Sequence, residues 1–140
     1  MSRVKYNFNF DGSDYAKQLT TEMDINFFRV LKEAATGVAD PIDKNNIIES
    51  INRALRIINT PEYIFVANPK YKDEFDEFFK KHRDICVKVL YSKEVEENKF
   101  IAIKNDAAHL EYYYPENNFI PISYTTKILH PDHIIIYNVE

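Results

Sequence analysis

The first part of the chain repeats apolar residues with the period of an α-helix. From Asp14 to Ala35 they recur at steps of three and four, which predicts an amphipathic helix. Thr21 and Asp24 match a capping box, so a start at Thr21 is an alternative. A second helix is predicted from about Asp43 to Ile58, after a linker at 36–41 that is a candidate hinge. Its predicted buried face consists of Ile47, Ile51, Ala54, Leu55 and Ile58.

After residue 60 the apolar residues come in short continuous or alternating runs, which predict strands. The segment Lys70–Arg83 returns to the helical period and predicts a third helix between the first two strands. The predicted strands are Tyr63–Ala67, Ile85–Tyr91, Lys99–Lys104, Ala107–Tyr114, Phe119–Tyr124 and Ile134–Val139.

The order of these elements predicts an α+β fold, because the helices are segregated from most of the strands. We expect two N-terminal helices, a central β-α-β unit and a C-terminal, mostly antiparallel set of strands, together forming one mixed sheet. The 140 residues correspond to a single domain over 1–140. Near the N-terminus, Tyr6, Phe8 and Phe10 alternate with polar residues, which predicts a strand that the sheet of a neighbouring molecule completes.

The composition excludes several classes of enzyme. The chain has only two glycines, Gly12 and Gly37, so it lacks the glycine-rich phosphate-binding loops and the G-x-S-x-G nucleophile elbow. Its one cysteine, Cys86, cannot form an internal disulfide. Because Cys86 stands in an apolar run, we expect a buried small hydrophobe rather than a catalytic thiol.

The charge and the length of the apolar runs bear on the partners. A formal net charge of −4 disfavours nucleic acid, which needs a basic surface. No run has the length of a membrane span or a signal peptide. We therefore expect protein partners, no nucleic acid and no membrane. The expected location is the host cytoplasm or the virion, without secretion.

The sequence His130-Pro131-Asp132-His133 contains residue types that bind zinc or iron. Two histidines three residues apart on a turn do not define a coordination geometry. A third ligand would have to come from His82, His109 or Glu111. We favour a structural turn before the last strand and expect no metal and no other cofactor, with His130 and His133 as the candidate ligands of the alternative.

The sequence Glu111-Tyr112-Tyr113-Tyr114-Pro115 is the most distinctive surface candidate. On a strand, Tyr112 and Tyr114 share one face and Tyr113 lies on the other. One set then packs in the core, and the other is available to a partner, since tyrosine is enriched at protein interfaces. Packing in the core alone is the alternative. Together with Tyr6 and Phe8, these tyrosines are the candidate interface residues.

The middle of the chain resembles a known family. The run Ile64–Pro69 is an apolar strand that ends in an Asn-Pro turn, and a helix, the strand Ile85–Tyr91, an acidic turn at Ser92–Asn98 and a further strand follow it. This order resembles the axial domain of the major capsid proteins of tailed bacteriophages. With Leu19–Asp24 and the Tyr113-Tyr114-Pro115 tract, the resemblance extends over residues 19–115. It implies assembly through surfaces and supplies no catalytic residues.

Three functional hypotheses follow from these observations. The first is a phage structural or assembly protein that acts through protein–protein contacts with itself or with other virion components, as part of the capsid, head or connector. The alternative is a small phage-encoded inhibitor or regulator that binds a host or defence protein. The third is a metal-dependent enzyme that uses the turn with His130 and His133. We expect a protein that is not an enzyme.

Overall fold

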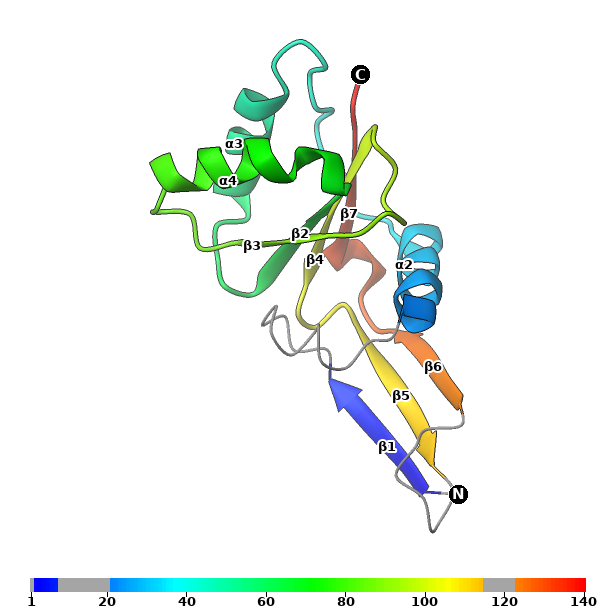
Figure 1. The fold of residues 1–140 in the computed structure, drawn as a ribbon. Helices are drawn as coiled ribbons and strands as arrows, with labels where there is room; N and C mark the ends of the chain where they lie inside the picture. The colour runs from blue at the N-terminus through cyan, green and yellow to red at the C-terminus, as the bar shows by residue number, and fades with distance from the viewer. Residues whose placement is uncertain (1, 8–20, 115–122) are drawn as a thin grey trace.

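The computed structural model describes residues 2–7, 21–114 and 123–140. In these ranges the α+β fold is confirmed, with three helices and two short 3₁₀ turns (Figure 1). The helical elements are α2 (Thr21–Ala34), α3 (Ile47–Ile57), η1 (Pro69–Tyr71), α4 (Lys72–Lys81) and η2 (Pro131–His133). The strands are β1 (Ser2–Asn7), β2 (Tyr63–Ala67), β3 (Lys88–Tyr91), β4 (Lys99–Lys104), β5 (Ala108–Tyr114), β6 (Ser123–Ile128) and β7 (Ile134–Asn138).

The described strands form two sheets, so the prediction of one mixed sheet is wrong. The larger sheet has the order β3-β2-β4-β7, in which β2 is parallel to β3, and β4 is antiparallel to β2 and β7. The smaller sheet has the order β1-β5-β6 and is antiparallel. Since β2 and β7 occupy both sides of β4, the next strand, β5, has no edge to join there and pairs outside the larger sheet.

The N-terminal strand is present, but its partner is within the chain. Strand β1 pairs with β5 from Ser2 opposite Tyr114 to Asn7 opposite His109. The strand is therefore completed on one side within the chain, and pairing with a neighbour's sheet stays a prediction. In Figure 1 the smaller sheet extends away from the body that the larger sheet and the helices form.

Both faces of the larger sheet are covered by helices, and this explains the nearly continuous apolar runs of β2 and β4. Ile64 and Val66 of β2 belong to a core with α2, whereas Phe65 belongs to a core with α3 and α4. The ring of Phe65 lies 5.4 Å from that of Phe100 and 5.7 Å from that of Tyr137, measured between centroids. This aromatic packing joins β2, β4 and β7 under α4.

Several element boundaries differ from the predictions, two of them because a side chain bonds to the backbone. Helix α3 starts at Ile47 and not at Asp43 as predicted. The residues before it form a turn in which Asp43 N donates to Ser50 Oγ at 3.1 Å. Strand β3 begins three residues later than predicted, since Cys86 N donates to Asn59 Oδ1 at 2.7 Å instead of to a neighbouring strand. Strand β6 extends to Ile128, which lies opposite Ala108 of β5, whereas 119–122 lie outside the described residues.

The linker after α2 runs along β7. Gly37 N donates to Ile134 O at 3.0 Å, and Ile42 N donates to Asn138 O at 2.8 Å. The segment between Gly37 and Ile42 is therefore held at both ends against β7, with isolated parallel bridges at Gly37 and Ile42. The hinge proposed for 36–41 stays a prediction.

Candidate interaction surfaces

The predicted interface tyrosines lie on the smaller sheet. Tyr112–Tyr114 belong to β5 and Tyr6 to β1, whereas Phe8 lies outside the described residues. The register puts Tyr112 opposite Val4 and Tyr113 opposite Arg3. Directly opposite positions share a face of an antiparallel sheet, and successive positions alternate, so Tyr112 and Tyr113 occupy different faces. A role in an interface stays a prediction for these residues.

The turn before β7 joins one predicted histidine to a carboxylate that the sequence did not indicate. His133 Nδ1 lies 2.7 Å from Asp106 Oδ1, and the rings of His130 and His133 are 4.9 Å apart. Burial raises the pKa of Asp106, whereas the hydrogen bond with His133 and nearby positive charges lower it. Their combined effect is larger, so the pKa of Asp106 lies below its usual value. The pair connects the β4–β5 turn to η2 over a separation of 27 residues, for which the sequence carries no local signal.

The described residues supply no complete metal site. Within them, no group of three or more His, Cys, Asp or Glu side chains could hold a metal ion. His82, one of the predicted third ligands, lies at the end of α4 with Nδ1 3.4 Å from Arg56 Nη2. The side chains of His109 and Glu111 lie outside the described set. The metal-dependent enzyme stays a hypothesis without a third ligand.

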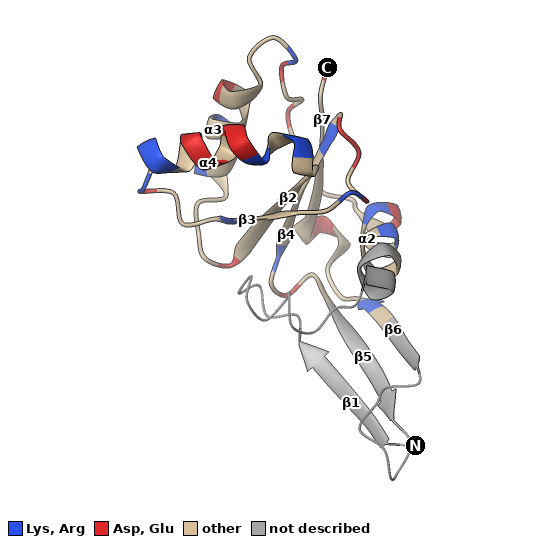
Figure 2. Cartoon of the chain, in the orientation of Figure 1, with Lys and Arg blue, Asp and Glu red and all other residues tan. Residues whose placement is uncertain are grey.

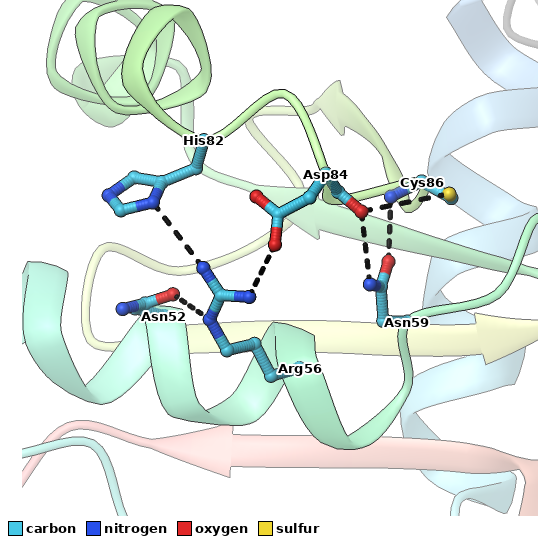
Figure 3. A network of polar contacts seen from close by, with 6 residues as sticks. All are labelled: Asn52, Arg56, Asn59, His82, Asp84 and Cys86. Carbon is cyan, nitrogen blue, oxygen red and sulfur yellow. Dashed lines mark hydrogen bonds and ion pairs between the residues drawn. The ribbon is translucent and has the colours of Figure 1, made fainter.

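A polar network fastens the loop after α4 to the end of α3 (Figure 3). Arg56 Nη1 lies 2.6 Å from Asp84 Oδ2, and Arg56 Nε donates to Asn52 Oδ1 at 2.9 Å. Asn59 donates to Asp84 O at 3.2 Å and accepts from Cys86 N. The hydrogen bond from Arg56 stabilises the carboxylate and thereby lowers the pKa of Asp84. The network is exposed, and its contacts explain the path of the loop.

The expectation that Cys86 is buried is wrong, because its side chain is exposed. It precedes β3 and alternates with its neighbours, Ile85 and Val87, which are both buried. The thiol donates to the Asp84 carbonyl oxygen over 3.9 Å. In the apolar run around this residue, buried and exposed side chains therefore alternate, because the core covers only one side of the chain there.

The charges on α4 are ordered along the helix. Asp73 and Glu74 lie in its first turn, and Lys80 and Lys81 lie in its last turn (Figure 2). Acidic residues near the N-terminus and basic residues near the C-terminus interact favourably with the helix dipole and so stabilise α4. All four side chains are exposed, and their arrangement is that of a solvated helix face.

A cavity of about 440 Å³ lies between α3, the segment 38–42 and β7. Val38 and Ile57 line it and are 94% and 81% exposed. Burial raises the pKa of Tyr137, which also lines the cavity, to about 12. The sequence reasoning missed this site, although the apolar Ile57 outside the predicted buried face of its helix was a usable signal. The other lining residues are Ala39, Asp40, Pro41, Ile42, Ser50, Arg53, Ala54, Ile58 and Ile135.

No protein-family model matches the sequence, and no curated protein matches it. Among the helices in the described ranges, none has both the length and the apolar character needed to cross a bilayer.

The fold, by contrast, is similar to a solved structure, that of a virus-like particle from Pyrococcus furiosus. The TM-score is 0.50 at 12% sequence identity, over 97% of this chain and 75% of that chain. At this identity the likeness concerns the fold. This chain thus shares its fold, at a distance, with the protein of that virus-like particle.

Proposed function

We propose that this chain is a structural protein of a shell-like assembly and that it acts through contacts between protein surfaces. The observation that carries the proposal is the fold likeness to the virus-like particle, which extends over 97% of this chain. The finer assignment, a capsid, head or connector component of a tailed bacteriophage, is supported by the resemblance of residues 19–115 to the axial domain. Its partners are then other copies of itself or other virion components.

The small sheet provides a second argument for assembly. Strands β1 and β6 are its two outer strands in the order β1-β5-β6. An outer strand presents backbone N–H and C=O groups on one side, and such groups pair readily with a strand from another chain. Because this sheet extends away from the body (Figure 1), its edges are well placed to reach a neighbouring molecule.

Sedimentation velocity and negative-stain electron microscopy of the purified full chain test the proposal. We expect discrete rings, sheets or closed particles whose amount rises with protein concentration. A strict monomer at every concentration, together with no binding to virion components, would overturn it. A stoichiometric complex with a host enzyme in place of self-association would support the inhibitor hypothesis.

A further inference from the structure

Two exposed apolar side chains line the cavity beside α3. Val38 and Ile57 are two of the three large apolar side chains that are exposed among the described residues, and both line this cavity. Covering apolar surface removes it from water, which is favourable. Two exposed apolar side chains that line one hollow therefore give a partner surface to cover.

The two walls of the cavity carry opposite charges. Arg53 lies on the α3 wall, and Asp40 lies on the wall formed by the segment 38–42. Neither side chain forms an ion pair with any residue that the structure describes. Within the part of the chain that the structure describes, the cavity therefore has one unpaired cation on one wall and one unpaired anion on the other.

The order of these residues is the same along both walls. The first turns of α3 lie beside the C-terminal end of the segment 38–42, because Asp43 N donates to Ser50 Oγ. The C-terminal end of the helix lies near the start of that segment, so that Ile57 and Val38 line the same cavity. Arg53 and Ile57 are one helical turn apart, about 6 Å along the axis. Val38 and Asp40 are two residues apart on the other wall, which is bridged to β7 at Gly37 and Ile42. On each wall the charged residue therefore lies nearer in the chain to the Asp43–Ser50 contact than the apolar residue does.

We propose that a second copy of this chain covers the cavity, related to the first by a twofold axis that runs along it. The rotation exchanges the walls, so that Arg53 meets the partner's Asp40 and Ile57 meets the partner's Val38, each contact occurring twice. A twofold contact requires a surface that is complementary to itself, and opposite charges on opposite walls satisfy this requirement. The inference rests on the proposed function, since it names the face through which copies associate.

Charge exchange tests this arrangement. Arg53→Glu and Asp40→Arg each create two like-charged contacts in every dimer, and we expect each variant to raise the dimer dissociation constant about tenfold or more in sedimentation equilibrium. An equimolar mixture of the two variants forms a heterodimer in which both contacts join opposite charges. The mixture, and the chain that carries both substitutions, should therefore regain the dissociation constant of the unaltered chain.

Arg29→Glu, on an exposed position of α2 away from the cavity, is the matched control and should leave the dissociation constant unchanged. If neither reversal weakens association, or if the mixture does not restore it, the inference is wrong, while assembly of the unaltered chain would leave the proposed function standing. A weakening by Ile57→Asp without restoration by charge exchange would show that a different segment or partner occupies the cavity. A monomeric unaltered chain would overturn the inference, and it would overturn the proposed function only if the chain also bound no virion component.

Discussion

The replacement Gly37→Ala tests how tightly the wall of the cavity is held against β7. A Cβ atom at this position would lie 2.7 Å from Ile134 O, 2.7 Å from Ile135 Cγ1 and 3.0 Å from Asp132 O. Two of these three atoms belong to the backbone, so they cannot move aside by a change of rotamer. Because the φ angle of Gly37 is not positive, the cost comes from the close approach and not from the backbone conformation.

The size of the effect follows from three contributions. Overpacking of this kind costs about 1–3 kcal/mol. Displacement of Gly37 also weakens its hydrogen bond to Ile134 O, which contributes about 0.5–1.5 kcal/mol. Alanine restricts the unfolded chain, which offsets about 0.4–1 kcal/mol. Together these contributions give an expected net loss of about 0.5–4 kcal/mol in the free energy of unfolding.

Urea denaturation followed by circular dichroism measures this loss, at a protein concentration below that of any self-association. The neighbouring replacement Val38→Ala is the control, because the side chain is 94% exposed and its loss should change stability by less than about 0.5 kcal/mol. Equal stabilities of the two variants would refute the reasoning and would mean that the segment 38–42 is not packed against β7 as described.

Three further predictions concern the small sheet and two titrating groups. Tyr112→Ala and Tyr113→Ala should differ, since the two positions occupy opposite faces: one should lower stability by about 3–5 kcal/mol, and the other should keep the fold and weaken association. If both variants only destabilise, neither tyrosine forms an interface. Because burial raises the pKa of Tyr137 from 10.0 to about 12, the folded state holds this proton more tightly and stability should fall as the pH rises from 10 to 12. Tyr137→Phe should reduce this fall in alkaline denaturation curves, and an unchanged slope would contradict the burial of the phenol. The hydrogen bond from Arg56 lowers the pKa of Asp84, so its carboxylate contributes stability above its ordinary pKa and loses it as the pH falls through the lowered value. Asp84→Asn should therefore destabilise the chain at neutral pH but not in acid, whereas equal destabilisation at both would exclude this ion pair as the cause.

The proposals about self-association use different parts of the molecule. The small sheet presents strand edges, and the cavity beside α3 presents an exposed apolar side chain and a charge of opposite sign on each of its two walls. A shell needs more than one kind of contact, because a single twofold contact closes into a dimer. The two surfaces together therefore provide what a larger assembly requires.

The local pattern of the sequence determined most of the individual elements. The bounds predicted for β2 and β4 are those of the structure, because both faces of these strands are buried and every residue between the polar ends is apolar. The predictions of helices in the regions of α2, α3 and α4 are also confirmed. A helix with one buried face repeats its apolar residues every three or four positions, and this period is visible in the sequence. The elements and the α+β class follow from periods that are visible within a few turns.

Only the tertiary structure decided which strands pair and which surfaces are formed. Ser2 lies opposite Tyr114, and His133 reaches Asp106, over separations that no local period encodes. The division into two sheets depends on the pairing of β2 and β7 with the two sides of β4, which leaves no place there for β5. The cavity depends on the path of the segment 38–42 along β7. A periodic pattern shows that a side chain has a covered face, but the identity of the covering element depends on contacts between distant parts of the chain, and these are settled only when the whole molecule packs.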